Sequence, residues 1–264
     1  FYECLCKINL DFRLGFNYNA EAVRLEKLNT SLVYKFDPIE LINSVRSPNR
    51  KRKYKIVSKE FSKEELQYWN DYYINNNILD IYNVKSVKEY KIDYGSSWKS
   101  VYKHSEDDFC FAYIIASKSK EEPSIKLYRP NNKKYKWSSS LVETGVCHGY
   151  EQLTDDYSHL IISSSLKEVM CLRSMGFNSC CPVSESSHID SDYISEIKNK
   201  YKDNVYIMYD RDKAGINNSI KHSQLYNIKQ IKMPYMGGYK DVSDSCKHTS
   251  FYNVKDKIRC TLNI

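Results

Sequence analysis

The sequence predicts an α/β protein, in which an N-terminal α+β subdomain is followed by a unit built around a four-stranded, mainly parallel sheet. Strands and helices alternate from residue 159 onward, and this alternation is typical of βαβ units. The first 150 residues instead place helices before a series of strands. Glycine and proline number only 8 and 6 in the 264 residues, too few for an all-β protein with many tight turns.

The N-terminal part is predicted to begin with helices and a basic linker. We expect short helices in residues 1–45 and a basic linker at 47–60 that leads into a strand. Ser62 precedes Glu65 by three residues, and this capping box predicts a helix that begins there. Residues 93–108 are polar and rich in turn-forming residues. A second short helix is predicted at 78–82, and strands are predicted at 84–92, 109–116 and 124–128.

The C-terminal part reads as a parallel sheet whose strands are joined by helices. Strands are predicted at 160–162, 179–183, 205–209 and 228–233, with helices at 165–175, 190–201 and 212–225 between them. In such sheets the functional residues follow the carboxyl ends of the strands. The chain therefore divides into a helical segment with a basic linker (1–57), an α+β subdomain (58–157), an α/β domain (158–250) and a C-terminal tail (251–264).

Positive charge is concentrated in two stretches of a chain whose formal net charge is +7. Residues 46–65 and 118–136 each carry an excess of basic over acidic side chains. The second stretch interleaves aromatic and basic residues, a combination that stacks bases and holds the backbone of single-stranded nucleic acid. Its candidate binding residues are Lys126, Arg129, Lys134, Lys136 and Trp137. The alternatives are a solvated linker for the first stretch and an exposed hairpin for the second.

The cysteines indicate a reducing compartment. There are nine, an odd number, and none forms a Cys-x-x-Cys pair, so we expect free buried thiols and no zinc site within this chain. The apolar runs are too short to span a membrane. Residue 1 is Phe and no signal peptide precedes it, so we expect a cytoplasmic, non-secreted protein whose chain begins inside a longer one.

Acidic residues follow all four predicted parallel strands. Asp210 and Asp212 come directly after the third strand, and paired carboxylates at that position are suited to Mg²⁺ or Mn²⁺. Asp212 could instead only cap the next helix, but that does not explain Asp210, which follows five mostly apolar residues. The other candidates are Glu168 after the first strand, Glu185 after the second, and Asp241 and Asp244 after the fourth.

These residues carry a resemblance to the Toprim domain, a metal-binding unit of bacterial-type primases, topoisomerases and some nucleases. Asp210-Arg211-Asp212-Lys213-Ala214-Gly215 resembles its Asp-x-Asp-x-Ala-Gly pattern, and the Ala-Gly ending is typical of primases. Lys240-Asp241-Val242-Ser243-Asp244 resembles the primase Lys-Asp-x-x-Asp turn. Where Toprim domains carry Glu-Gly-x-x-Asp, this chain has Ser164, Ser165 and Glu168. That variant is similar to phage-type primases.

The resemblance extends upstream with less specific motifs. Residues 61–90 resemble the helix-rich start of the primase polymerase core, and 128–137 resemble the basic strand segment that precedes the Toprim unit. Residues 1–15 resemble the helix that follows a primase zinc-binding domain. The resemblance thus covers most of the chain but is specific only in the Toprim part.

The resemblance implies a DNA primase, a DNA-directed RNA polymerase that makes short RNA primers on single-stranded DNA by metal-dependent nucleotidyl transfer. It implies that Asp210, Asp212 and Glu168 are catalytic and hold Mg²⁺ or Mn²⁺ with Asp241 and Asp244. Lys167, Arg211 and Lys240 would bind nucleotide phosphates. The implied partners are template DNA, nucleoside triphosphates and a replicative helicase, in a bacterial or phage-infected cell and without a membrane.

Two other functions remain open from the sequence. One is a Toprim nuclease or topoisomerase-like enzyme. The other is a non-catalytic, degenerate Toprim module that binds nucleic acid in a replisome, and Ser164 in place of the usual Glu is its best support. We hypothesise that Glu185 supplies the missing carboxylate, because neighbouring parallel strands would bring its loop to the same crevice. The alternative is that Glu185 is a solvated loop residue.

Overall fold

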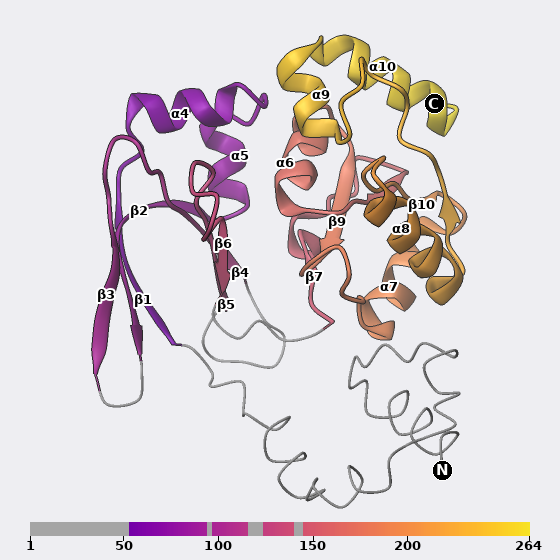
Figure 1. Ribbon diagram of the computed structural model, residues 1–264. Coiled ribbons are helices and arrows are strands. Elements are labelled where there is room, and N and C mark those ends of the chain that lie inside the picture. Colours follow the sequence, from indigo (N-terminus) through magenta and orange to yellow (C-terminus); the bar gives the residue numbers. More distant parts are fainter. Residues whose placement is uncertain (1–52, 94–96, 116–123, 140–144) are drawn as a thin grey trace, which may run out of the picture. The chain divides into compact units, whose positions relative to one another are not determined.

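The computed structural model describes residues 53–93, 97–115, 124–139 and 145–264 (Figure 1). The chain divides into two compact units, residues 1–51 and 52–264, and every described residue belongs to the second. The helices predicted in residues 1–45, and residues 46–52 of the first basic stretch, lie outside the described residues. Within the described part, no helix combines the length and the apolar character needed to cross a membrane.

The first half of the described chain forms an antiparallel sheet with two helices, as the sequence predicts. The sheet has the order β1-β2-β4-β5-β6, and β3 also pairs with β2. Its strands are β1 (Tyr54–Lys59), β2 (Val84–Asp93), β3 (Trp98–Lys103), β4 (Phe111–Ile115), β5 (Ser124–Tyr128) and β6 (Trp137–Ser139). Helices α4 (Lys63–Asn70) and α5 (Asn76–Ile81) lie between β1 and β2 in the chain.

The predicted capping box starts α4 and also attaches it to the sheet. The Ser62 hydroxyl accepts a hydrogen bond from the Glu65 backbone N–H at 3.2 Å, and the Glu65 carboxylate accepts one from the Ser62 N–H at 2.8 Å. Glu65 is fully buried, and its carboxylate also binds Lys59 of β1 at 2.5 Å and Ser86 of β2 at 2.8 Å. A buried carboxylate with this many partners is satisfied, so α4 is held against two strands.

Strand β3 corrects the sequence interpretation of residues 93–108 as a turn-rich connection. It pairs with β2 as a hairpin arm, and only Tyr102 among its residues is buried, against Tyr90 at 5.5 Å between ring centroids. An arm that is exposed at nearly every position lacks the alternation of apolar and polar residues by which strands are recognised. The short strand β6 was missed for the same reason.

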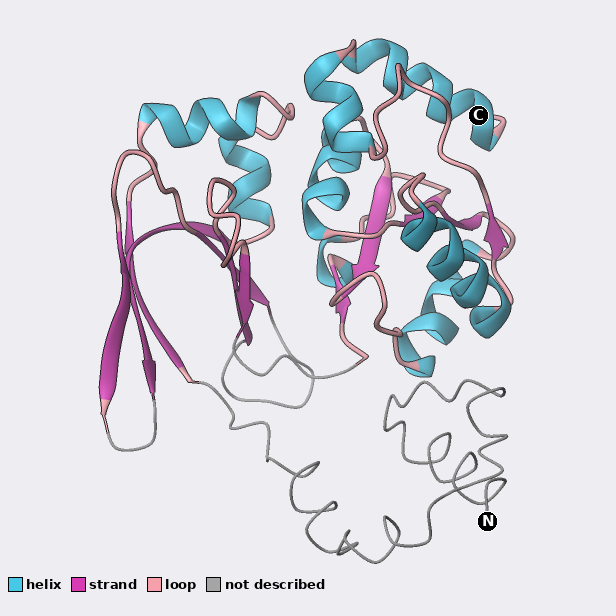
Figure 2. Ribbon diagram, in the orientation of Figure 1, coloured by secondary structure: helices cyan, strands magenta, loops and turns pink. Residues whose placement is uncertain are grey.

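The second half forms the predicted parallel sheet (Figure 2). Its order is β11-β10-β8-β9-β7, and the four predicted strands are parallel. They are β8 (Leu160–Ile162), β9 (Asn178–Pro182), β10 (Val205–Ile207) and β11 (Lys229–Gln230). The unpredicted strand β7 (Cys147–His148) adds an antiparallel edge next to β9. The mainly parallel, four-stranded prediction is confirmed, with β7 as a fifth strand.

Helices cover both faces of the parallel sheet. The helices are α6 (Leu166–Ser174), α7 (Ser191–Tyr201), α8 (Lys213–Tyr226), α9 (Val242–His248) and α10 (Phe251–Leu262). Alternate residues of β8 point to opposite faces: Ile161 packs in the cluster with α6, α9 and α10, and Ile162 packs in the cluster with α7 and the end of α8. The first cluster continues into α4 and α5, so one core joins the two halves.

Candidate functional site

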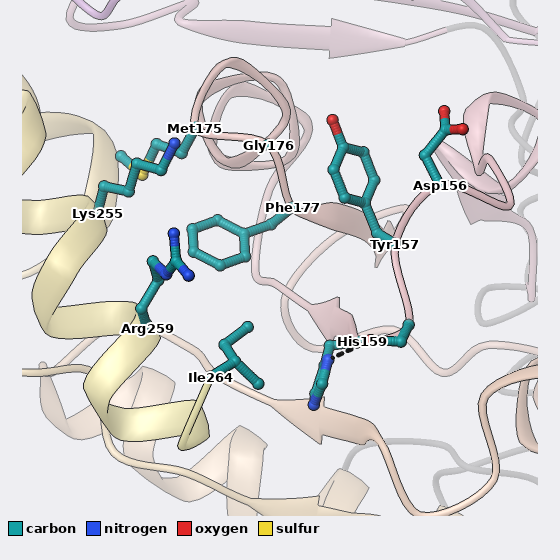
Figure 3. A pocket seen from close by; sticks show the side chains of 10 residues that line it. Asp156, Tyr157, His159, Met175, Gly176, Phe177, Lys255, Arg259 and Ile264 are labelled. Carbon is teal, nitrogen blue, oxygen red and sulfur yellow. Dashed lines mark hydrogen bonds between the residues drawn. The ribbon is translucent and has the colours of Figure 1, made fainter.

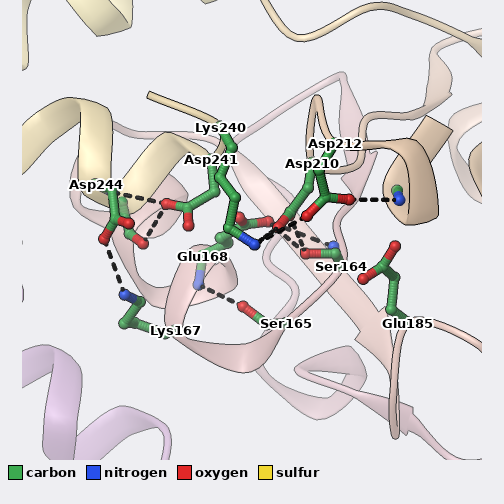
Figure 4. Close-up of polar contacts among 12 residues, drawn as sticks. Ser164, Ser165, Lys167, Glu168, Glu185, Asp210, Asp212, Lys240, Asp241 and Asp244 are labelled. Atoms are coloured by element: carbon green, nitrogen blue, oxygen red, sulfur yellow. Dashed lines mark hydrogen bonds and ion pairs between the residues drawn. The ribbon is translucent and has the colours of Figure 1, made fainter. Parts of the chain in front are cut away.

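Three carboxylates from three different elements meet at the carboxyl edge of the parallel sheet (Figure 4). Asp210 follows β10, Glu168 lies in the first turn of α6, and Asp241 is the N-cap of α9. One carboxylate oxygen from each lies within 4.8 Å of the others. Among the described residues this is the one group of three or more acidic, His or Cys side chains close enough to share a metal ion.

Glu168 is buried and is held by the serines that follow β8. The Ser163 hydroxyl donates to its carboxylate, and the Ser164 hydroxyl lies 3.0 Å from the same oxygen. Ser165 caps α6 and fixes the position of the helix start. Burial, together with the neighbouring Asp210 and Asp241 carboxylates, raises the pKa of Glu168 well above its usual range. Three anionic groups this close therefore favour a shared proton or a bound cation.

The Ser164 hydroxyl shows the same need for a positive charge. Its oxygen lies 2.8 Å from Asp210 Oδ1 and 3.0 Å from Glu168 Oε2. A hydroxyl has one proton to donate, so it can satisfy only one of these two carboxylates. The second contact requires a protonated carboxyl group or a cation that both carboxylates share.

The donor set fits a hard divalent cation. All three ligands are carboxylate oxygens, as Mg²⁺ and Mn²⁺ prefer. Oxygens on one Mg²⁺ at about 2.1 Å can be at most about 4.2 Å apart, so a cluster within 4.8 Å needs only a small closure. Such an ion would supply charge neutralisation and phosphate orientation when bound.

Asp212 lies outside this cluster and caps helix α8. Its Oδ1 accepts from the Gly215 N–H at 2.9 Å, and its Oδ2 lies 3.0 Å from the Lys240 ammonium. These contacts lower the pKa of Asp212. Gly215 allows the helix to begin here, since a Cβ on it would lie 2.3 Å from the Asp210 carbonyl oxygen. The close approach of helix and strand end thus explains the glycine of the motif's Ala-Gly ending.

Most of the other charged residues predicted in the C-terminal half lie next to the cluster. Asp244 is 3.4 Å from the Lys167 ammonium, and that ammonium lies 4.2 Å from the centre of the Tyr72 ring. Lys240 bridges Asp210 and Asp212. Arg211 instead lies over the exposed Tyr235 ring, at 4.9 Å from its centre.

A cavity of about 1000 Å³ opens in front of the cluster. One wall, from the parallel-sheet half, carries Glu168, Asp210, Asp241 and Lys167. A second wall, from the antiparallel-sheet half, carries Tyr128 and Trp137, whose rings stack at 4.3 Å between centroids, and the side chain of Lys136. One cavity therefore joins a carboxylate cluster to an aromatic and basic surface.

Lys126 connects the two walls rather than facing solvent. Its ammonium donates to the Val183 carbonyl at 2.7 Å, just after β9, and lies 4.8 Å from the centre of the Trp137 ring. Burial lowers the pKa of Lys126. Its contacts indicate a role in holding the second sheet against the first.

Two of the predicted nucleic-acid-binding residues lie away from the cavity lining. Arg129 forms a two-point ion pair with Asp108 and stacks over Tyr102. Lys134 lies over the exposed Tyr135 ring at 5.2 Å. Arg129 thus has a structural partner, whereas Lys134 and Lys136 are exposed.

Glu185 lines the same cavity but is not a member of the carboxylate cluster. Strands β8 and β9 are neighbours, as the hypothesis about this residue required. Its Oε1 accepts from the Asn218 amide at 3.3 Å. Partial burial and the nearby Asp210 and Asp212 raise the pKa of Glu185. Its part in metal binding stays a prediction.

Sequence reasoning missed several residues of the cavity. Tyr68, Tyr72, Lys247 and His248 line it, and only the packing of α4 and α9 brings them there. The Ser163 hydroxyl carried a weak signal, since three serines follow β8. A second pocket of about 400 Å³ lies at the other end of α6, beside Phe177, Lys255 and Arg259 (Figure 3), and holds none of the predicted site residues.

Solved structures similar to this chain include primase catalytic cores. The DnaG catalytic core is 12% identical, with a TM-score of 0.54 over 78% of this chain and 73% of that chain. A DnaG primase catalytic domain bound to single-stranded DNA is 12% identical, with a TM-score of 0.52 over 75% and 74%. The E. coli primase catalytic core is 13% identical, with a TM-score of 0.52 over 75% and 71%. No protein-family model and no curated protein matches the sequence. The chain thus has the fold of a primase catalytic core.

Proposed function

We propose that this protein synthesises short RNA primers on single-stranded DNA by metal-dependent nucleotidyl transfer. The observation that carries the proposal is the cavity, whose lining combines the Glu168, Asp210 and Asp241 carboxylates with the Tyr128–Trp137 stack. The primase-core fold supports it. In the reaction a 3′-hydroxyl attacks the α-phosphate of a nucleoside triphosphate, and pyrophosphate leaves.

Each wall of the cavity has a separate task in this proposal. Glu168, Asp210 and Asp241 hold the divalent ion, and Lys167 faces the same space with its ammonium for a nucleotide phosphate. Asp244 orients Lys167. Trp137, whose side chain is exposed, stacks a base, and Lys136 contacts the strand's phosphates. A replicative helicase as partner stays a prediction.

Primer synthesis on a single-stranded template with four nucleoside triphosphates and Mg²⁺ or Mn²⁺ tests the proposal. Asp210→Asn keeps the shape and removes the charge. Loss of a residue that only supports a metal ligand costs about 10- to 100-fold, so we expect the loss of a direct ligand to reduce product at least about a hundredfold. Asp203→Asn, on an exposed acid remote from the cluster, is the matched control. Failure of the parent protein to make primers would contradict the proposal.

The same reactions separate the two alternatives. Template cleavage that requires Asp210 would indicate a Toprim nuclease. Binding of single-stranded DNA with neither primers nor cleavage would indicate a non-catalytic module.

A further inference from the structure

Lys240 places a positive charge between two carboxylates of the motif that follows β10. Its ammonium lies 3.3 Å from Asp210 Oδ2 and 3.0 Å from Asp212 Oδ2. The two oxygens of Asp210 therefore face different partners, because Oδ1 contacts the Ser164 hydroxyl at 2.8 Å on the side of Glu168. We call the space among Glu168, Asp210 and Asp241 the inner position, and the space between Asp210 Oδ2 and Asp212 Oδ2 the outer position.

The main chain determines where Lys240 lies. Its carbonyl oxygen accepts a hydrogen bond from the Arg211 N–H at 2.8 Å, and Arg211 lies between the two aspartates in sequence. The loop before Lys240 is fixed by the buried Met236 and by Tyr239, which stacks on His248 at 4.9 Å. The next residue, Asp241, belongs to the inner position. Lys240 and Asp241 are consecutive in the sequence, and they place an ammonium at the outer position and a carboxylate at the inner position.

We infer that Lys240 is a built-in cation that occupies the outer position, so that the site takes one divalent ion, at the inner position. This inference rests on the metal binding that the proposed function requires. The ammonium lies about 3 Å from both oxygens, so a divalent ion bound to the same two oxygens would lie close to the ammonium. Like charges that close repel strongly, so the two cannot occupy the outer position together. With the Lys240 charge removed, Asp210 and Asp212 offer two carboxylate oxygens to a second ion, which suffices for Mg²⁺ or Mn²⁺ that keep most of their waters.

A plain surface ion pair is the competing explanation. Lys240 is 54% exposed, and exposed pairs contribute little to stability. The two explanations differ in metal stoichiometry, because a surface pair that does not occupy an ion position leaves the number of bound ions unchanged when it is removed.

Titration of the whole, metal-free chain with Mn²⁺, followed by electron paramagnetic resonance and calorimetry without nucleotide or DNA, decides between them. We expect one bound ion in the parent and in Lys240→Arg, and two in Lys240→Met. Adding Asp212→Asn to Lys240→Met should restore a single ion. Lys213→Met makes the same charge change beside Asp212 at an exposed lysine and should leave one ion.

Several outcomes would overturn the inference: two ions in the parent, none in the parent, or one ion in Lys240→Met with unchanged affinity. Lys240→Gln replaces Lys240→Met if circular dichroism shows that the latter is not folded. The titration does not measure primer synthesis. One bound ion in the parent and two in Lys240→Met therefore support the inference even if the primer assay fails.

Discussion

Ser164 illustrates how one hydroxyl can hold two carboxylates apart. Its oxygen lies between Asp210 and Glu168, at 2.8 and 3.0 Å. Ser164→Ala removes the hydroxyl between the two carboxylates, so we expect the free energy of unfolding in metal-free buffer to fall by about 2 kcal/mol, the worth of a hydrogen bond to a charged group. Urea titrations with and without Mg²⁺ measure this, and Mg²⁺ should recover most of the loss. An equal loss in both buffers would contradict the explanation.

His148 gives a second prediction, on acid stability. Both ring nitrogens lack a hydrogen-bond partner among the described residues, and the side chain is 1% exposed. Burial, and to a lesser degree the Lys126 charge, lowers the pKa of His148 from 6.5 to about 3. Below pH 6.5 the unfolded chain therefore takes up a proton that the folded chain does not, so stability falls as the pH falls.

His148→Leu removes this proton uptake. From pH 7 to pH 5 the variant should lose about 2 kcal/mol less of its free energy of unfolding than the parent loses. The figure follows because pH 5 lies about 1.5 units below the ordinary histidine pKa, and each unit is worth about 1.4 kcal/mol. Urea unfolding at several pH values measures the difference. A variant whose pH dependence equals that of the parent would show that the imidazole is not held neutral.

At the scale of elements, the start of α8 depends on a missing side chain. A Cβ on Gly215 would lie 2.3 Å from the Asp210 carbonyl oxygen and 2.8 Å from the Asp210 Cβ. Gly215→Ala must therefore move the helix start or the strand end. We expect a destabilisation of about 1–3 kcal/mol, typical of overpacking, and weaker Mn²⁺ binding because Asp210 moves.

Gly176→Ala, at the end of α6 away from the cluster, is the control for this change. A Cβ there would meet only the Tyr157 ring, at an ordinary contact distance of 3.7 Å, and the cost comes from its φ of +86°. It should lower stability without altering Mn²⁺ affinity. If Gly215→Ala binds Mn²⁺ as the parent does, the close contact does not position Asp210.

The elements that the sequence predicts well are those with local signals. The Ser62–Glu65 capping box starts α4, and apolar runs mark β8 and β10. Strand β7 has two residues and exists because β9 offers it an edge, so no local pattern predicts it. Helix α10, in the segment predicted as a C-terminal tail, did carry a signal, since Val254, Ile258 and Leu262 recur at four-residue spacing and are buried.

At the scale of the whole molecule, the site was predictable as a set of residues but not as an arrangement. The motif spacing indicated Asp210, Asp212 and Asp241 equally. Only the packing of α6 and α9 against the sheet places Glu168 and Asp241 beside Asp210 and leaves Asp212 as a helix cap. A sequence cannot distinguish a metal ligand from a helix cap here, because both are carboxylates at a strand end or a helix N-terminus.

The basic surface makes the last prediction, on binding to single-stranded DNA. Arg129, Lys134 and Lys136 are alike in sequence, but Arg129 is paired with Asp108 while the two lysines are exposed. A cation already neutralised by a carboxylate releases few counterions from DNA when it binds. The Lys134→Ala/Lys136→Ala double variant should therefore flatten the log–log dependence of affinity on salt by about 1.4, or about 0.7 for each lost phosphate contact on a single strand.

Arg129→Ala should leave that slope near the parent value and instead lower stability, because Asp108 loses its partner. Fluorescence anisotropy of a labelled single strand at several salt concentrations measures the slopes, and urea unfolding measures stability. The effect of the lysines should be similar for all template sequences, since phosphate contacts carry no base information. If Arg129→Ala flattens the slope as much as a lysine variant does, the ion pair opens to receive DNA, and the binding surface extends from the cavity across β5 to Asp108.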